Sequence, residues 1–219
     1  MGSKPAHHPV TRLPREFFAR PVLDVARDLL GAHLSHSGVT VRITETEAYA
    51  GDRDPGSHAF RGLTPRTAPM FGPAGVSYVY FTYGMHWMLC LVTGGPGAAE
   101  AVLVRAGEVI DGHDVAADRR PGILNRDWCR GPARLATTLA LNGSHTGRDF
   151  CRPLLGDVAS LDLTIEAGAP VFDSRVRTGP RVGVSGPGGD GTAYPWRFLI
   201  DGDPTVSVYR PGVIRRRSR

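Results

Sequence analysis

The stretch VTVRITETEAYAG, residues 39–51, predicts a long β-strand that ends at a glycine. Side chains two residues apart in an extended chain point to the same side of the strand. Read at every second position, one side carries Val39, Val41, Ile43, Glu45, Glu47 and Tyr49. The side that begins as apolar core therefore ends with two carboxylates and a phenol. We interpret its far end as the floor of a cleft, with a solvent-facing sheet edge as the alternative.

The segments on either side of this strand predict more strands and one short helix. Before it, PVLDVARDLLG (residues 21–31) predicts a helix that ends at its glycine, and HLSHSG (residues 33–38) predicts a strand and a turn. After it, residues 51–75 are punctuated by glycine and proline, which predicts a long loop. VSYVYFTYGMHWMLCLVTGG (residues 76–95) then has two runs of strand-forming residues around a Tyr-Gly-Met turn, which predicts a hairpin.

The second half of the chain continues the same pattern. AEAVLVRAGEVI (residues 99–110) predicts a buried strand, and GPARLATTLALNG (residues 131–143) predicts a helix with Pro132 at its first position. RVGVSG (residues 181–186) predicts a strand, and WRFLIDGDPTVSVY (residues 196–209) predicts a hairpin. The fold class expected from this order is α+β, with a curved antiparallel β core flanked by helices.

Length and composition indicate one globular domain. The chain has 219 residues, of which 41% are hydrophobic and 21% charged, without repeats or an evident linker. We expect a disordered leader over residues 1–10, a single domain over residues 11–210 and a basic tail over residues 211–219. No apolar run approaches the about 18 residues of a membrane span, and the leader has no apolar signal region. A cytoplasmic location without membrane contact is the expectation.

Net charge indicates a class of partner, and the cysteine and histidine patterns indicate whether a metal is bound. The formal net charge is +5, which favours a polyanionic partner such as nucleic acid. Lys4 is the only lysine, so the other 25 of the 26 basic residues are arginine. Three cysteines lie far apart, and the eight histidines form no metal-binding motif, so we expect reduced thiols and no metal or other cofactor.

Glu45 and Glu47 are the first candidate catalytic groups. On one strand they lie about 6.6–6.8 Å apart along the chain. A carboxylate in a cleft can act as a general base. The spacing also lies within the about 6.5–9.5 Å between the two carboxyl groups of inverting glycosidases. Hydrolysis at an anomeric carbon is therefore suggested, and a carbohydrate-active hydrolase remains open.

Aromatic and basic residues near these acids favour a nucleic-acid substrate. Flat side chains concentrate near the acidic strand end and in the hairpin: Tyr49, Tyr78, Tyr80, Phe81, Tyr83 and Trp87. Some will be ordinary strand packing, but such side chains also stack on bases. Tyr83 at the hairpin tip could enter a base stack as a wedge. Arginines that could meet phosphates lie in the long loop and at the start of the predicted helix, namely Arg53, Arg61, Arg66, Arg130 and Arg134.

Six segments resemble the alkyladenine (3-methyladenine) DNA glycosylase family. They are ETEAYAG (45–51), SHAFRGLTPRTAPMFG (57–72), SYVYFTYGMHWMLCLV (77–92), AVLVRAGEV (101–109), RGPARL (130–135) and RVGV (181–184). The resemblance runs from about residue 11 to residue 209. It implies a single compact α+β domain, like the C-terminal domain of formyltransferases, whose hairpin protrudes toward DNA. It also implies a monomer, associated with the nucleoid, that acts in base excision repair.

The same resemblance implies roles for individual residues. Glu47 is implied as the general base that activates water, with Arg105 and the backbone of Val182 placing that water. The implied base pocket has Tyr49, His58 and Tyr80 around a damaged purine flipped out of double-stranded DNA. Tyr83 is implied to fill the gap in the duplex. Phosphate contacts are implied for Arg66, Arg134 and Met85.

Two features qualify this expectation. Where the family usually has asparagine on the pocket floor, this chain has Cys90, which is smaller and a weak hydrogen-bonding group. We expect selectivity to be relaxed or shifted toward guanine-type lesions. Glycosylases that also cut the strand use an amine, and Lys4 lies in the leader, so a monofunctional enzyme that leaves an abasic site is expected. A non-catalytic damaged-DNA-binding protein of the same fold and an RNA substrate remain alternatives.

Overall fold

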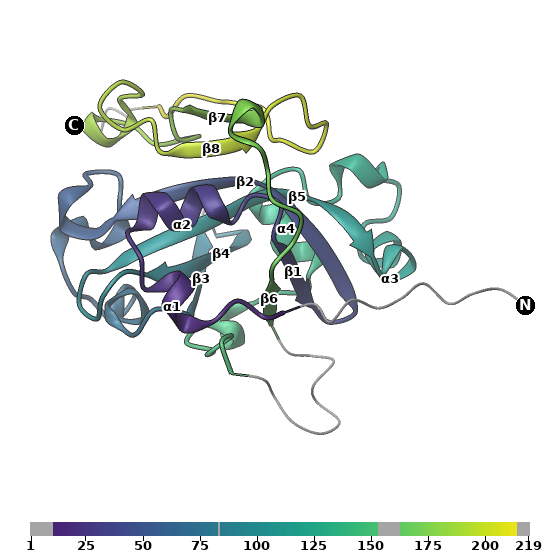
Figure 1. The fold of residues 1–219 in the computed structure, drawn as a ribbon, viewed down its shortest axis with the longest axis horizontal. Helices are drawn as coiled ribbons and strands as arrows, with labels where there is room; N and C mark the ends of the chain where they lie inside the picture. Colours follow the sequence, from purple (N-terminus) through teal and green to yellow (C-terminus); the bar gives the residue numbers. More distant parts are fainter. Residues whose placement is uncertain (1–10, 83, 153–162, 214–219) are drawn as a thin grey trace, which may run out of the picture.

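The strand predicted around residues 39–51 is β2 (Val39–Ala50), at the centre of the structure. The computed structural model describes residues 11–82, 84–152 and 163–213. Within them, one antiparallel sheet has the order β3-β4-β5-β2-β1-β6, and β8 pairs with both β2 and β7 (Figure 1). The other strands are β1 (His33–His36), β3 (Ser77–Thr82), β4 (His86–Thr93), β5 (Glu100–Asp111), β6 (Thr164–Glu166), β7 (Val176–Gly179) and β8 (Arg197–Ile200).

Short helices flank this curled sheet. Their bounds are α1 (Arg15–Phe18), α2 (Val22–Asp28), α3 (His113–Arg119) and α4 (Pro132–Thr138). α2 packs against β2, and α4 packs against β4 and β5. Single 3-10 turns are η1 (Gly51–Arg53), η2 (His58–Arg61), η3 (Ala68–Phe71), η4 (Asn125–Asp127), η5 (Gly143–His145), η7 (Asp173–Arg175) and η8 (Pro187–Gly189). The α+β expectation, the existence of both predicted helices and the loop over residues 51–75 are confirmed, but the helices end at Asp28 and Thr138, before the glycines expected to end them.

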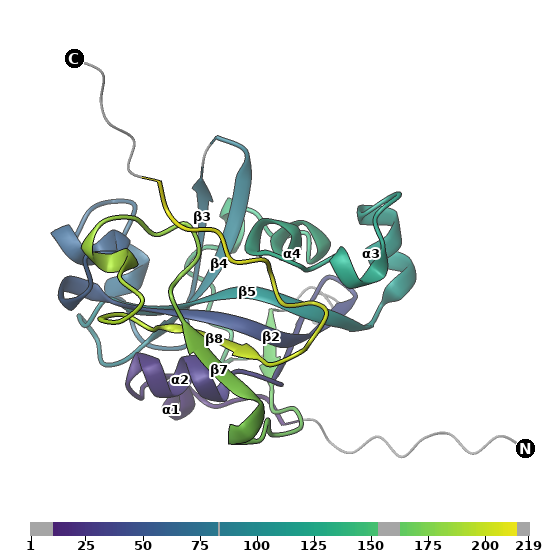
Figure 2. The ribbon, with the colours of Figure 1, turned by 90° about the horizontal axis from the view of Figure 1, so that it is seen from above.

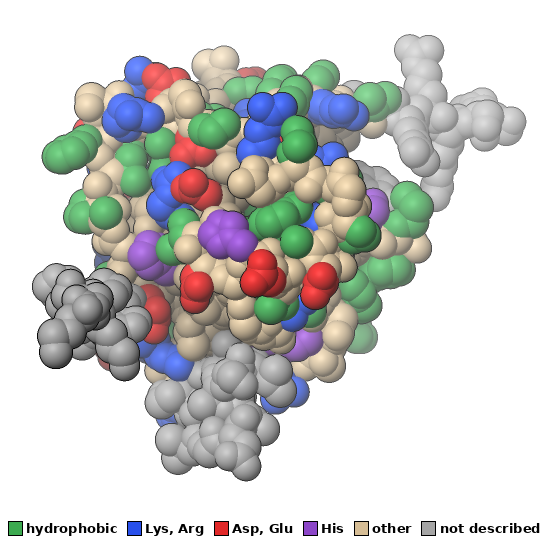
Figure 3. Space-filling model, turned by 90° about the vertical axis from the view of Figure 1, so that its right-hand side faces the viewer, with side chains coloured by type: hydrophobic (Ala, Val, Ile, Leu, Met, Phe, Trp, Pro, Cys, Tyr) green, Lys and Arg blue, Asp and Glu red, His purple; other side chains and the backbone are tan. Residues whose placement is uncertain are grey.

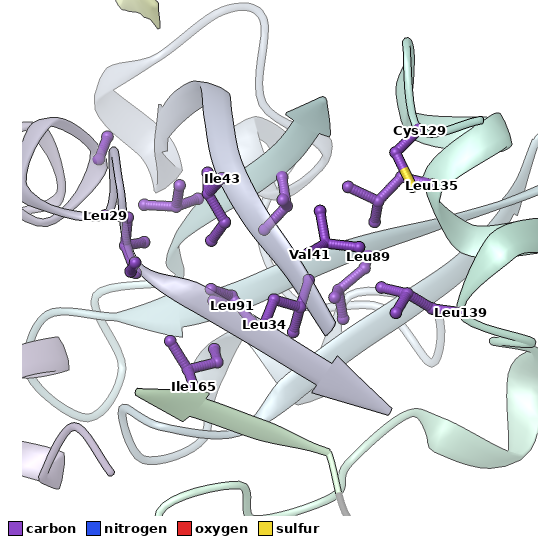
Figure 4. Close-up of a cluster of buried hydrophobic side chains, with 14 of the residues drawn as sticks. Leu29, Leu34, Val41, Ile43, Leu89, Leu91, Cys129, Leu135, Leu139 and Ile165 are labelled. Atoms are coloured by element: carbon purple, nitrogen blue, oxygen red, sulfur yellow. The ribbon is translucent and has the colours of Figure 1, made fainter. Parts of the chain in front are cut away.

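The main core lies between the sheet and the helices. Figure 4 shows Val41 and Ile43 of β2 beside Leu89 and Leu91 of β4, with Leu29, which follows α2, also pointing into this core. A smaller cluster on the other side of the sheet contains Tyr78, Cys90, Ala101 and Leu103, with Tyr49 packed against it. The central strands therefore have one face toward the main core and one toward the second cluster.

β2 changes the face that it buries, so the expectation that its six alternate residues share one side is wrong. Val39, Val41 and Ile43 belong to the main core, and so do Ala48 and Ala50, which have the opposite parity. Register shifts against β5 occur between Ile43 and Glu45 and between Glu45 and Thr46. An extra residue at such a bulge re-aims the side chains that follow. The carboxylates therefore lie on the face opposite the core.

The C-terminal third differs from the prediction. β8 forms as expected, but residues 201–213 are not a strand, and residues 181–186 form a loop. β8 pairs with β7 and with Glu45–Glu47 of β2 instead. The backbone N–H of Ser207 donates to Glu45 and that of Gly183 donates to the Arg210 carbonyl. These contacts hold the final segment over β2 and β5 (Figure 2).

The β3–β4 hairpin stands out from the body of the sheet (Figure 2). On the face shown in Figure 3, basic side chains gather toward the upper edge and acidic ones mostly below them. Among the described residues no helix has the length and apolar character required to cross a membrane. The predicted leader over residues 1–10, the hairpin-tip residue Tyr83 and residues 214–219 of the predicted tail lie outside the described residues.

Candidate active site

A cleft of about 880 Å³ opens on the side of the sheet that carries the second apolar cluster. Its walls come from the ends of β2, β3, β4 and β5, the loop at residues 55–58, the start of α4 and the loop at residues 182–185. Of the residues with expected roles, those that line it are Tyr49, His58, Tyr80, Cys90, Arg105, Arg134 and Val182. Segments far apart in the sequence therefore meet at one concave site.

Glu47 lies directly behind the cleft wall. Its side chain is fully buried, and it does not line the cleft itself. Oε1 accepts a 2.7 Å hydrogen bond from the backbone N–H of Val182 and lies 3.4 Å from Nη1 of Arg105. Oε2 accepts a 2.8 Å hydrogen bond from the hydroxyl of Tyr49. The three groups that contact this carboxylate all line the cleft, so they separate it from the open space.

Arg105 connects Glu47 to Glu45. Its Nε donates to Oε1 of Glu45 at 3.1 Å, while its side chain is only 8% exposed. Burial by itself lowers the pKa of Arg105, but the nearby carboxylates of Glu47 and Glu45 raise it more, and the net direction is upward. The guanidinium therefore stays charged beside both acids.

Glu45 does not face solvent, so the sheet-edge alternative is wrong for it. The side chain is fully buried and also accepts hydrogen bonds from Nε of Arg197 at 2.6 Å and from the backbone N–H of Ser207 at 2.7 Å. The sequence pattern offered no signal for these two partners, because they come from β8 and from the segment after it.

A second buried ion pair supports the loop that carries Val182. Arg181 donates to both carboxylate oxygens of Asp54, at 2.5 and 2.6 Å, and both side chains are completely buried. The guanidinium also lies 4.6 Å from the ring centre of Tyr49. A Cβ added at Gly56 would come within 2.5 Å of this guanidinium, so that position requires glycine. Neither Arg181 nor Asp54 was a sequence candidate, although Arg181 opens the RVGV segment.

The aromatic wall is formed mainly by three rings. Tyr78 and Tyr80 are stacked with centroids 5.1 Å apart, and His58 meets Tyr80 edge-on at 4.8 Å. Burial, followed by the negative charge of Glu47, raises the pKa of Tyr49 well above its usual value. Burial, followed by the positive charge of Arg66, lowers the pKa of His58. At neutral pH Tyr49, beside this wall, is therefore a protonated phenol, and His58 in the wall is an uncharged imidazole.

Cys90 forms part of the cleft floor. It lies on β4 opposite Tyr78 of β3 and Leu103 of β5, and it is 5% exposed. Burial, together with the charge of Glu47, raises the pKa of its thiol. The floor therefore presents a small, neutral thiol rather than a thiolate.

Basic side chains surround the cleft mouth. Arg130, Arg134 and Arg210 line it, and Asp127 lies 3.4 Å from Arg130 and 3.7 Å from Arg134. Arg66 is exposed near Tyr80, with its guanidinium carbon 5.6 Å from the ring centre. Met85 is exposed in the turn just before β4 and does not line the cleft.

The remaining candidate arginines are elsewhere. Arg53 forms an ion pair with Glu100, and Arg61 is exposed at the end of η2. Among the described residues, no cluster of three or more histidine, cysteine, aspartate or glutamate side chains is arranged to hold a metal ion. The cleft thus combines a buried acid, aromatic walls and a basic rim.

Comparisons with known proteins show the family to which the chain belongs. The family model of methylpurine-DNA glycosylase matches residues 16–204. A protein of Streptomyces avermitilis named "Putative 3-methyladenine DNA glycosylase" is 53% identical over 94% of this chain and 96% of its own length. Proteins of the same name from Frankia casuarinae and Leifsonia xyli subsp. xyli are 48% and 44% identical, each over 90% of this chain and 92% of the relative. The chain therefore belongs to the methylpurine-DNA glycosylase family of DNA-repair hydrolases.

Proposed function

We propose that this protein binds double-stranded DNA as a monomer, flips a damaged purine into the cleft and hydrolyses its N-glycosidic bond. The observation that carries the proposal is the environment of Glu47, a fully buried carboxylate held between Arg105, Val182 and Tyr49 at the wall of an aromatic cleft. A general base needs a fixed orientation and limited access to bulk water. This arrangement supplies both.

In the proposed reaction, Glu47 takes a proton from a water that attacks C1′ of the sugar. That water replaces the direct hydrogen bond from the backbone N–H of Val182 to Glu47, so that this N–H and the guanidinium of Arg105 hold the water against the carboxylate. The C1′–N bond breaks as the C1′–O bond forms, and the purine leaves with the bonding electrons. The carboxylate also stabilises positive charge that develops on the sugar.

Selectivity for a damaged purine follows from charge as well as shape. Alkylation at a ring nitrogen makes the purine cationic, and an electron-rich ring face attracts a cation by about 0.5–2 kcal/mol. Tyr49 and Tyr80 stay protonated because burial raises the pKa of both phenols. A damaged base pair also costs less to open. Both effects favour the lesion over an intact purine.

The remaining DNA contacts belong to the same proposal. Arg134 lines the cleft mouth, and Arg66 and Met85 are exposed near it, so we propose that these three positions meet the DNA backbone. Tyr83, outside the described residues, is proposed to occupy the space left by the flipped nucleotide. We propose that the enzyme is monofunctional and does not cut the strand through an amine, because the chain has one lysine, at position 4.

The alternative function, a carbohydrate-active hydrolase, is less well supported by the structure. That reading needs Glu45 as a second carboxylate at the substrate, but Glu45 is fully buried, does not line the cleft and bonds to Arg105 and Arg197. A proton-transfer partner must reach the substrate or a bridging water. The glycosylase proposal needs only Glu47.

Single-turnover excision from a duplex with one 3-methyladenine tests the proposal, with Glu47→Gln as the matched variant. The amide keeps the size of the side chain but cannot take a proton, so we expect the excision rate to fall at least about 100-fold, the lower end of a general-base contribution. The affinity of the variant for the lesion duplex should stay close to that of the wild type. Equal excision by the two proteins would show that Glu47 is not the general base. DNA binding without excision by the wild type would favour the alternative of a non-catalytic damaged-DNA-binding protein.

A further inference from the structure

Glu45 sits behind the cleft and meets the groups that surround Glu47. Its Oε1 accepts from Nε of Arg105 at 3.1 Å, from Nε of Arg197 at 2.6 Å and from the hydroxyl of Ser207 at 3.0 Å. Its Oε2 accepts from the backbone N–H of Ser207 at 2.7 Å. A fully buried carboxylate with this many donors is fixed in place.

These bonds determine the orientation of Arg105. A guanidinium is planar, so fixing two of its nitrogens fixes the direction of the third. Nε is held by Glu45 and Nη2 donates to the Ser207 hydroxyl at 3.3 Å, which leaves Nη1 directed at Glu47. Ser207 itself is bonded to Glu45, so both contacts depend on the same carboxylate.

The distances also show which carboxylate holds Arg105 more closely. The contact with Glu45 at 3.1 Å is a hydrogen bond, whereas Nη1 stays 3.4 Å from Glu47. Without the charge of Glu45, Glu47 would be the one carboxylate among the described residues within ion-pair distance of this guanidinium, and the 3.4 Å contact would shorten into a hydrogen bond. A Glu47 oxygen occupied in that way is less available to take a proton from water.

We propose that Glu45 is a positioning residue, which holds Arg105 near Glu47 and prevents it from closing onto that carboxylate. This inference rests on the function proposed above. It gives Glu45, the first acid of the ETE segment, a role that does not require contact with substrate. Its partners come from β5, β8 and the segment after β8.

A purely structural role is the competing explanation, because Glu45 also fastens the C-terminal segment to β2. Asp203 offers a matched control for that role. It accepts hydrogen bonds from Arg42 at 2.7 Å and from the Thr205 hydroxyl at 2.6 Å, so it fastens the same segment. Asp203 does not line the cleft.

The test compares Glu45→Gln with Asp203→Asn in single-turnover excision of 3-methyladenine from duplex DNA. We expect Glu45→Gln to slow excision about 100-fold, the size of effect produced by a 1 Å misplacement at a reacting centre, while affinity for the lesion duplex changes less than about threefold. Asp203→Asn should lower the thermal midpoint yet keep the wild-type excision rate. A near-wild-type rate for Glu45→Gln, or an equal loss in Asp203→Asn, would overturn the proposal.

A double-mutant cycle tests whether Glu45 acts through Arg105. If it does, Glu45→Gln combined with Arg105→Gln should be no slower than Arg105→Gln alone. Multiplicative losses would mean that Glu45 acts independently of Arg105, which contradicts the proposal. Should Glu45→Gln fail to fold, Ser207→Ala decides the question, because it removes one of the two contacts that orient Arg105, the hydroxyl between Glu45 and Nη2, and keeps every charge. We then expect severalfold slower excision, and an unchanged rate would count against the proposal.

If the proposed function itself is wrong, the excision results will differ from those that would overturn only the role of Glu45. If the wild type does not excise, or if Glu47→Gln excises as fast as the wild type, the proposed function falls and the role of Glu45 falls with it. If Glu47→Gln is inactive and Glu45→Gln is normal, only the positioning role is lost.

Discussion

Asp54 and Arg181 form a bidentate ion pair in which neither side chain is exposed, with N–O distances of 2.5 and 2.6 Å. Arg181 also donates to the carbonyls of Ala48 and Gly188, at 2.9 and 2.8 Å. The pair therefore joins the end of β2 to the loop that presents the Val182 N–H to Glu47. A buried charge that loses its partner is strongly destabilising.

Asp54→Asn should lower the free energy of unfolding by about 3–5 kcal/mol, because it leaves the Arg181 guanidinium buried without a countercharge. Urea denaturation measures the change. The control is Asp52→Asn, an exposed residue two positions earlier, for which we expect a change within about 0.5 kcal/mol. Similar values for both variants would contradict the importance assigned to the buried pair.

Tyr49→Phe should slow excision at least about tenfold and leave affinity for the lesion duplex nearly unchanged. The variant keeps the ring face but removes the hydroxyl that donates to Oε2 of Glu47 at 2.8 Å, a type of bond that contributes about 1.5–3 kcal/mol. Single-turnover kinetics and a binding titration separate the two effects. Tyr194→Phe is the control, and a loss of affinity rather than of rate in Tyr49→Phe would contradict this role.

His58 should titrate below the ordinary histidine pKa of about 6.5. Burial and then the charge of Arg66 lower the pKa of this imidazole, so Arg66→Gln should raise it toward the usual value, whereas Arg61→Gln in the same loop should not. An NMR titration of the ring protons measures all three proteins. Since the folded protein binds this proton less readily than the unfolded chain does, His58 contributes stability that is fully present above about pH 6.5 and lost as the pH falls through its folded pKa.

Cys90→Asn should shift selectivity away from guanine-type lesions. The thiol is smaller and bonds more weakly than the asparagine amide that the resemblance leads us to expect here, so we expect the wild-type floor to leave room for the exocyclic amino group of guanine. Comparing excision of alkylated guanine with that of alkylated adenine gives the ratio for each protein. Cys151→Ser, outside the cleft lining, should keep the wild-type ratio. An unchanged ratio in Cys90→Asn would contradict the prediction that Cys90 affects selectivity for guanine-type lesions.

Borohydride should trap no covalent adduct between this protein and lesion-containing DNA. A trapped Schiff base requires an amine, and the chain supplies Lys4 and the N-terminal amine. Electrophoresis of the borohydride-treated mixture detects an adduct, and a strand-cutting glycosylase is the positive control. An adduct that persists in Lys4→Ala with a blocked N-terminus would contradict the monofunctional proposal.

Several elements of the fold could be read from the sequence because their signals are local. Alternating β-branched residues predicted β2, and the apolar spacing of residues 21–31 predicted α2, although this helix ends at Asp28, before Gly31, whose φ is 83°. The turn at Ser37–Gly38 also has the positive φ angles expected there. Clustered glycines and prolines predicted the loop over residues 51–75, which carries His58 to the cleft.

Features that depend on pairing between distant segments could not be read in this way. The register shifts between β2 and β5 move the core face of β2 from Ile43 to Ala48, a change set by how two strands fit together rather than by either strand alone. Residues 204–209 alternate like a strand, yet Ser207 donates to Glu45 because that buried carboxylate requires donors.

The sequence by itself determined where the acids, aromatic residues and arginines occur and which local elements carry them, because these depend on side-chain type and near neighbours. Only the tertiary structure decided that Glu47 meets Val182 across 135 positions of chain and that Glu45 turns away from the cleft toward Arg105 and Arg197. The reason is physical: a carboxylate removed from water must find donors wherever the folded chain brings them, and that choice is made in space.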